Sequence, residues 1–390
     1  MTQNNKIHLE FFILGLFLVA FATNAYLLLG NFGKFFSLIT GSSLLGISVI
    51  RFGRGIDKKK FIVFSSSLLL LTFYIIHSFL MKQETFTVNI IIFDLVNLFL
   101  FFVGYHIGGI RNQNLELKPY IFILILVLIL LSTLKYYLFQ KSLNPSIEGA
   151  RNIADDLNPV GVAYTNSIIL WTIIWLLKCN KKLSSRILLI PSLIGTLLII
   201  FFTESRGALV YSILISIAIS GFSLLNIFKI KYIVPVILTF LVLQNFQVNE
   251  VFQNKSISLM DRFNILSGGS IQDRSIQERI ELQMDFYQNY DQMIFGKFKY
   301  TPYPHNQFIE IFMRFGILGI PLIFLSFKTL INSVRFYFNG IRKRNSIQTL
   351  MFLIFMFCYL QSMTSLNLDN NRILWLGFGV FLNSQVLIKE

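Results

Sequence analysis

Charged residues and cysteine are scarce in this chain. Only 14% of its 390 residues are charged, whereas 54% are apolar, and 42 are phenylalanine. This composition excludes an ordinary soluble domain, in which roughly a quarter of the residues are charged. Two cysteines, Cys179 and Cys358, are too few to form a disulfide framework.

Motifs for nucleotide phosphates, zinc and serine catalysis are also absent. The sequence has no G-x-x-x-x-G-K-[ST] loop, no Cys/His spacing typical of zinc sites and no serine-nucleophile elbow. No polar stretch is long enough to fold alone and take a nucleotide sugar. Any group-transfer chemistry must therefore use a donor that is already activated and already in the membrane.

Long apolar runs fill most of the sequence. Many approach the ~20 residues that a helix needs to cross ~30 Å of hydrocarbon. The chain is therefore predicted to be an all-α, polytopic transmembrane bundle, with residues 1–390 forming a single integral membrane domain. About twelve spans are expected, at 10–29, 35–50, 61–81, 88–110, 119–139, 161–178, 187–203, 208–228, 232–246, 306–326, 348–366 and 373–388.

The basic residues predict the orientation of the bundle. Together with Lys6 and Lys389, the loops on one side hold 20 of the 34 basic residues. Cytoplasmic loops are the ones enriched in Lys and Arg, so this side and both termini are placed in the cytoplasm. The net charge of +15 is explained by topology and does not indicate nucleic-acid binding.

Two larger loops are predicted on the outer side. One, at about 140–160, contains Arg151, Asp155 and Asp156; the other, 247–305, lies between spans nine and ten. Within the larger loop, apolar residues recur every three or four positions over 275–290, which predicts an amphipathic helix resting on the outer membrane face. Its cations, including Arg262, Arg274 and Arg279, run against the topology rule.

The segment Pro304-His305-Asn306 stands where this loop re-enters the apolar region. A single helix starting near Asn306 would place His305, Gly316 and Gly319 on one face. The glycines would then let a neighbouring helix approach closely, and the imidazole could transfer a proton near neutral pH. The alternative is that His305 only caps a helix at the interface.

Charges next to predicted spans need partners. Arg206, in the short outer turn Thr203-Glu204-Ser205-Arg206-Gly207, could bind a phosphate with its two-pronged guanidinium. The alternative is a Glu204–Arg206 pair at the interface. Glu310 and Arg314 are four residues apart and are expected to pair.

The other outer charges have weaker indications. Arg279 lies on the predicted amphipathic helix, at the depth of lipid headgroups, and could meet a lipid-linked pyrophosphate. For Arg262 and Arg274 a solvated charge is the competing interpretation, and Arg151 is a minor candidate for the same anion site. Asp155 and Asp156 lack nearby partner ligands, so no metal site is predicted.

Taken together, these residues resemble the motifs of a known family. His305-Asn306-x9-Gly316-Ile317-Leu318-Gly319 resembles the H-N-x9-G-x-x-G signature of the O-antigen polymerase and O-antigen ligase superfamily. The Ser205-Arg206-Gly207 turn and Arg279 are similar to its arginine turn and its loop arginine. Motif support covers residues 160–330. The loop of about 60 residues is a departure, because it leaves no room for an extra domain.

The resemblance implies an inverting, metal-independent glycosyltransferase that needs no cofactor and works at the periplasmic face of the bacterial inner membrane. The donor would be a glycan on undecaprenyl pyrophosphate. Arg206 and Arg279 would hold the pyrophosphate, and His305 would orient or deprotonate the acceptor hydroxyl. Asn306, Arg262, Arg274 and Arg151 would assist in binding, and sugar rings could stack on Tyr287, Tyr300 and Tyr303.

The acceptor separates two branches of the resembled family. A polymerase joins lipid-linked repeat units, whereas a ligase transfers the glycan to lipid A–core. The compact, phenylalanine-rich chain is more similar to the polymerase branch, for which a chain-length regulator protein is a candidate partner besides membrane lipids. A lipid-linked glycan transporter is the alternative from another class, although no internal repeat typical of transporters is visible.

Overall fold

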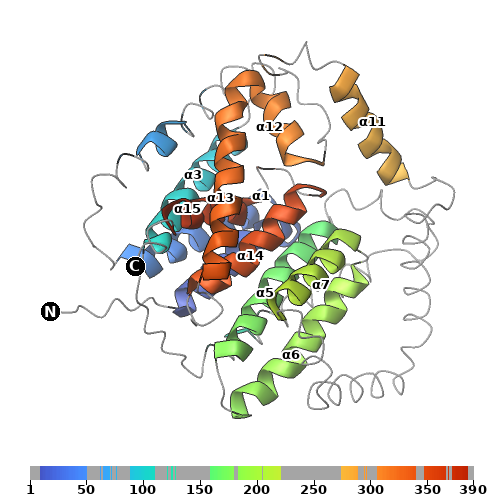
Figure 1. Ribbon diagram of the computed structural model, residues 1–390. Helices are drawn as coiled ribbons and strands as arrows, with labels where there is room; N and C mark the ends of the chain where they lie inside the picture. The colour runs from blue at the N-terminus through green and yellow to red at the C-terminus, as the bar shows by residue number, and fades with distance from the viewer. Residues whose placement is uncertain are drawn as a thin grey trace. The chain divides into compact units, whose positions relative to one another are not determined.

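The computed structural model of the protein describes residues 9–50, 62, 65–70, 72, 76, 88–109, 121, 124–125, 128, 159–179, 183–203, 205–220, 274–288, 294, 296, 305–339, 347–365, 368 and 371–384. Over these ranges the chain is 93% helical and has no strand, which confirms the all-α class (Figure 1). It divides into two compact units: unit 1 comprises 1–124 and 282–390, and unit 2 comprises 125–281.

Two helical stretches among the described residues are long and apolar enough to cross a membrane, namely 160–177 and 307–338. Shorter apolar helices occur at 9–22, 94–108, 189–200, 347–362 and 372–383. These helices coincide with several predicted spans. The spans predicted at 61–81, 119–139 and 232–246 lie wholly or largely outside the described ranges.

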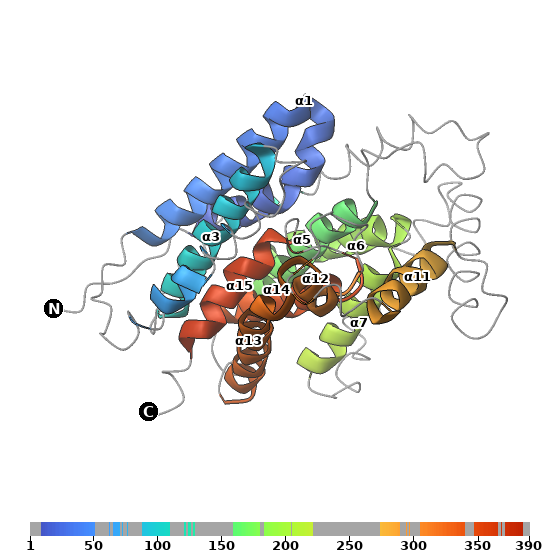
Figure 2. The ribbon, with the colours of Figure 1, turned by 90° about the horizontal axis from the view of Figure 1, so that it is seen from above.

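Unit 1 begins with α1 (Leu9–Ile50), which doubles back on itself. The Ser37 hydroxyl donates to the Leu18 carbonyl at 2.7 Å, and a Cβ on Gly15 would lie 2.8 Å from the Leu45 side chain. In a straight helix residues 15 and 45 would be about 45 Å apart. The chain therefore reverses within α1, and Figure 2 shows its two arms side by side. These arms correspond to the helices predicted at 10–29 and 35–50.

Among the helices that the structure describes in unit 1, α3 (Val88–Gly108) and α15 (Arg372–Asn383) pack most extensively against each other. Gly104 and Gly108 lie so near α15 that an added Cβ would come within 2.0 Å and 2.2 Å of its carbonyl oxygens. Small residues spaced by four are the usual means of bringing two apolar helices together. The Asn383 amide of α15 also donates to the Tyr105 carbonyl of α3 at 2.6 Å.

Two further helices of unit 1, α13 (Ile320–Asn339) and α14 (Ile347–Ser362), run antiparallel. Near one end the Tyr337 and Phe352 rings stack with centroids 4.8 Å apart, and near the other Ser326 Oγ lies 3.3 Å from Tyr359 Oη. The end at Ser326 is polar, and it forms part of the site described below.

Unit 2 contains α5 (Pro159–Cys179), α6 (Leu183–Phe202) and α7 (Arg206–Ser220), which pack against one another. Trp171 and Trp175 of α5 are buried. α6 and α7 are joined by residues 203–205 alone, as the short turn in the sequence predicts. α11 (Arg274–Gln288) confirms the helix expected at 275–290, and it crosses the boundary between the units at Leu282.

Candidate functional site

The segment after Asn306 forms a helical hairpin. It consists of α12 (Gln307–Phe315), the 3-10 turn η2 (Gly316–Gly319) and α13. Gln307 lies 3.2 Å from Ser326, which is 19 residues away and would be about 28 Å distant in a straight helix. Phe308 likewise stacks on Phe327 with ring centroids 4.7 Å apart. α12 therefore folds back along the first turns of α13 (Figure 1).

This hairpin corrects the prediction of one continuous helix over 306–326. Because the chain reverses at Gly316, His305 does not share one helix face with Gly316 and Gly319. Gln307 also lies level with the seventh residue of α13 rather than beyond its end, an offset of about 9 Å along that helix. His305 is thus set beside the body of α13 and not at its start.

Asn306 explains where α12 begins. Its backbone is extended (φ −148°, ψ 118°), and its side-chain oxygen accepts hydrogen bonds from the amides of Phe308 and Ile309 at 2.9 and 3.3 Å. This is an N-cap, which satisfies amides that the first helical turn leaves without partners. Asn306, which was predicted to bind substrate, therefore has a structural role: it caps α12 directly after His305.

Gly316 explains where α12 ends. Its φ of 59° and ψ of −139° are close to a region that essentially only glycine adopts. Ile294 passes directly alongside, accepting a 2.7 Å hydrogen bond from the amide of Ile317, and a Cβ on Gly316 would lie 1.9 Å from the Ile294 oxygen. The sequence predicted that a helix would approach Gly316, but its close neighbour is the backbone of Ile294 and Gly296.

Gly319 completes the turn between α12 and α13. An added Cβ would lie 2.8 Å from the Ile311 side chain and 2.9 Å from its carbonyl oxygen. A larger residue would therefore push α12 away from α13. The pattern His-Asn-x9-Gly-x-x-Gly consequently corresponds to one piece of structure, namely a cap, a nine-residue helix, its C-terminal glycine and a tight turn.

His305 stands immediately before this helix. It is half-buried and has a φ of 55°, the only positive φ outside glycine among the described residues. Such a backbone costs about 1–3 kcal/mol and persists only where the surroundings impose it. The alternative of a capping histidine is not needed, because Asn306 is the cap.

Directly behind His305, the carboxamide of Gln307 bridges two other helices. Its Nε2 donates to Ser326 Oγ of α13 at 3.2 Å, and its Oε1 accepts from Ser362 Oγ of α14 at 2.8 Å. All three side chains are fully buried. Buried polar groups are costly unless paired, so these bonds hold the start of α12 against the α13–α14 pair.

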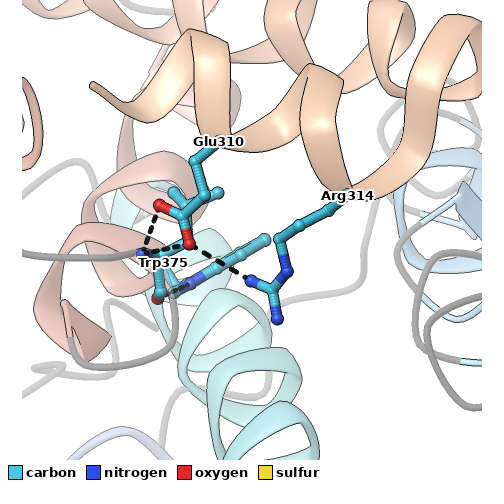
Figure 3. A network of polar contacts seen from close by, with 4 residues as sticks. Glu310, Arg314 and Trp375 are labelled. Carbon is cyan, nitrogen blue, oxygen red and sulfur yellow. Dashed lines mark hydrogen bonds and ion pairs between the residues drawn. The ribbon is translucent and has the colours of Figure 1, made fainter. Parts of the chain in front are cut away.

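Glu310, one turn further along, ties α12 to a different part of unit 1. Its buried carboxylate accepts from the amide of Leu368 at 3.1 and 3.3 Å and pairs with Arg314 at 3.4 Å, as predicted for residues four apart (Figure 3). The Leu368 carbonyl in turn accepts from Trp375 Nε1 at 2.9 Å. The carboxylate thus latches α12 to the connection between α14 and α15.

The second half of α11 covers another side of α12. Phe286 meets Phe312 edge to face, with centroids 5.7 Å apart, and packs with Ile309 and Met313. Tyr287, predicted to stack on a sugar, is on the exposed side of α11. α12 is therefore held by α13, by the Leu368 connection and by α11, while His305 remains half-exposed.

The remaining predicted site residues belong elsewhere. Arg206 is the first residue of α7 in unit 2, and Arg274 and Arg279 lie in the unit 2 part of α11. Their approach to His305 stays a prediction. Four predicted residues fall outside the described part of the chain: Arg151, Arg262, Tyr300 and Tyr303.

Sequence reasoning missed Gln307, Ser326 and Ser362. Each is a polar residue in an otherwise apolar helix, and such residues in predicted spans face the bundle interior and seek partners. That signal was present in the sequence, but it could not show that these three side chains meet. No family model matches the chain, and no curated protein matches it significantly.

Proposed function

We propose that the protein is an inverting, metal-independent membrane glycosyltransferase that polymerises undecaprenyl-pyrophosphate-linked oligosaccharide units, of the O-antigen polymerase type. The proposal begins from the signature that the sequence resembles. The observation that carries it is that this signature builds a single element held by buried hydrogen bonds. Asn306 starts α12, Gly316 ends it, and the buried bonds of Gln307 and Glu310 hold it in place beneath His305.

A support of this kind suits a group that must meet a reacting atom. Catalytic side chains act efficiently when their geometry is fixed before the reaction. His305 is partly exposed, whereas Gln307 and Glu310, whose polar side chains hold α12 in place, are buried. An acceptor hydroxyl could therefore reach the imidazole, whereas the supporting polar groups stay out of contact with substrate.

Arg206 supports the pyrophosphate role through its place on α7. It is the first residue of that helix, and the carbonyl of Ser205 before it accepts the first helical bond, from Leu209 at 3.1 Å. A helix N-terminus carries a partial positive charge that disfavours a guanidinium and favours an anion. A bound pyrophosphate would satisfy both the helix end and the arginine.

The reaction then runs as a single displacement. The acceptor hydroxyl attacks the anomeric carbon of the donor sugar as the bond to undecaprenyl pyrophosphate breaks, which inverts the configuration. His305 accepts the hydroxyl proton, and the leaving pyrophosphate retains the bonding electron pair. Arg206 and Arg279 stabilise its charge, so no nucleotide or metal is required.

The same proposal places the chain in the bacterial inner membrane. About twelve spans, cytoplasmic termini and a periplasmic 247–305 loop follow from the apolar runs and the distribution of Lys and Arg. The apolar stretch at 160–177 and the 20-residue helix α13 within the stretch at 307–338 support this placement. The exposed side chains of α13, which include Phe324, Phe327 and Ile331, would face lipid.

The test is reconstitution of the purified protein in liposomes with a lipid-linked repeat unit, without nucleotide and with a chelator. Parallel reactions would contain or omit lipid A–core, and the products would be separated on a gel. A ladder of longer lipid-linked glycans without lipid A–core is expected. Product that forms only with lipid A–core would instead assign the ligase activity.

Two variants make this test specific. His305→Ala is expected to abolish the ladder while the protein remains folded, and Arg206→Lys to weaken it strongly because lysine lacks the planar fork. Phe324→Leu, on the exposed face of α13, is the matched control and should leave the ladder unchanged. If no product forms in either reaction, the glycosyltransferase proposal is wrong and the transporter alternative gains weight.

A further inference from the structure

Gln307 has features that a simple packing residue does not need. It immediately follows the His305-Asn306 pair, its side chain is fully buried, and its carboxamide is used at both ends. The donor end meets α13 and the acceptor end meets α14. No other side chain in the described part of α12 bridges two helices with both ends of one polar group.

The bridge extends into a small network. Ser326 Oγ, which accepts from Gln307, itself lies 3.3 Å from Tyr359 Oη. Ser362 Oγ lies 2.8 Å from Gln307 and 2.6 Å from the Tyr359 carbonyl. The network therefore joins the start of α12 to two antiparallel helices, α13 at Ser326 and α14 at Tyr359 and Ser362.

The chemistry of a carboxamide limits what this network can do. An amide neither gains nor loses a proton near neutral pH, so a path through Gln307 cannot carry protons to or from His305. What an amide does well is fix direction, because its donor and acceptor ends are distinct. The arrangement is therefore suited to setting a position.

The position of His305 depends on the residues around it. Its φ of 55° is a backbone state that relaxes unless neighbouring residues impose it. Asn306 fixes the amides of the first turn, but it moves together with α12. Gln307, two residues after His305, ties this turn to α13 and α14, and so it sets where the start of α12 sits relative to both helices.

We propose that Gln307 is a positioning residue for His305: its carboxamide, held between Ser326 and Ser362, fixes the first turn of α12 and thereby the imidazole. The inference rests on the proposed function only in giving His305 the acceptor hydroxyl as its partner. The placement of the imidazole by Gln307 is a statement about the protein alone.

The experiment uses the full chain and three variants. Gln307→Leu removes both hydrogen bonds at similar volume, and Gln307→Glu keeps the acceptor for Ser362. Asn383→Leu is the matched control, because it removes a buried interhelical bond to Tyr105 at the far end of α15. Thermal unfolding would be recorded for each protein, so that kinetics are compared only between folded samples.

Two readouts follow the imidazole. In the transfer assay, Gln307→Leu is expected to lower kcat at least tenfold with the donor KM within twofold, and Gln307→Glu to lose less. Independently, labelling of His305 by diethylpyrocarbonate, resolved by mass spectrometry, should change in rate at least threefold in Gln307→Leu. Asn383→Leu should match the wild-type protein in both.

The second readout separates two kinds of failure. If the wild-type protein transfers no glycan, the proposed function is wrong, but a changed labelling rate in Gln307→Leu still supports positioning. If folded Gln307→Leu labels His305 at the wild-type rate, or if Asn383→Leu shows the same losses, the positioning role is overturned.

Discussion

Two short turns between helices in the described ranges, α6–α7 and α12–α13, are held in different ways. The α6–α7 turn is held by local bonds, in which the Thr203 hydroxyl donates to the Ile200 carbonyl at 2.6 Å and its amide to Ile199 at 3.1 Å. The α12–α13 turn is held by residues far apart in the sequence. Gln307 bonds to Ser362, Glu310 to Leu368, and Ile317 to Ile294.

This difference distinguishes Arg206, which follows the α6–α7 turn, from His305, which precedes α12. The bonds of the α6–α7 turn join residues close in the sequence, so they place Arg206 at the start of α7 without tying it to distant segments. A turn defined by distant segments fixes His305 relative to α13, α14 and the Leu368 connection. Four substitutions test that contrast.

Gly316→Ala should have the largest effect. It forces alanine into a backbone region that essentially only glycine adopts and places a Cβ 1.9 Å from the Ile294 oxygen, so we expect a destabilisation of about 3 kcal/mol or more. Thermal unfolding in detergent measures it. Gly195→Ala in α6 is the control, since its Cβ meets nothing within 4 Å. Equal behaviour of the two variants would contradict the contrast.

Glu310→Ala comes next. It leaves the Leu368 amide and the Arg314 guanidinium without their buried carboxylate, and removal of one partner from a buried ion pair costs about 3–5 kcal/mol. Because both side chains keep slight exposure, the lower end of that range is expected. Glu310→Gln retains an acceptor for Leu368 and should lose less. Denaturant titration compares them, and a Gln variant as unstable as Ala would refute the latch.

Asn306→Ala should cost about 1 kcal/mol, the usual loss when an N-cap side chain is removed. Asn306→Asp preserves the oxygen that accepts from Phe308 and Ile309, and its charge suits a helix N-terminus. It should therefore match the wild-type protein in unfolding temperature. Loss of stability in the Asp variant but not in the Ala variant would show that the side chain has another role.

Thr203→Val should have the smallest effect. The change removes one local hydrogen bond, worth at most about 1 kcal/mol, and keeps the shape of the side chain. Transfer activity should remain close to wild type, because Arg206 still begins α7. A loss as large as that of Glu310→Ala would mean that the α6–α7 turn is as constrained as the α12–α13 turn.

Apolar runs alone predicted most of the helices in the described ranges. The helices at 88–108, 159–179, 183–202, 347–362 and 372–383 follow the predicted spans closely, because length and hydrophobicity are local properties. The amphipathic helix at 274–288 was equally visible, since its apolar residues recur at helical spacing. That the chain crosses a membrane in about twelve spans remains part of the proposal, and two helical stretches in the described ranges are long and apolar enough to do so.

The reversal at Gly316 was not predicted. Apart from Ser326, the residues from Gly316 to Phe327 are apolar, so hydrophobicity gives no sign that a helix ends at Gly316. A sign did exist, because Arg314 followed by Gly316 fits the usual pattern of a helix C-terminus. The contacts of Gln307 with Ser326 and Ser362 depend on how three helices pack, and no local pattern contains that information.

The nine residues of α12 also set the distance and the rotation between Asn306 and Gly316. Each helical residue advances about 1.5 Å and turns about 100°. One inserted residue would rotate Gly316 away from Ile294 while Asn306 kept its place, and one deletion would do the reverse. The nine-residue interval in the His-Asn-x9-Gly pattern therefore fixes the length of α12. Chains that share the pattern are expected to tolerate substitutions within α12 far better than insertions or deletions.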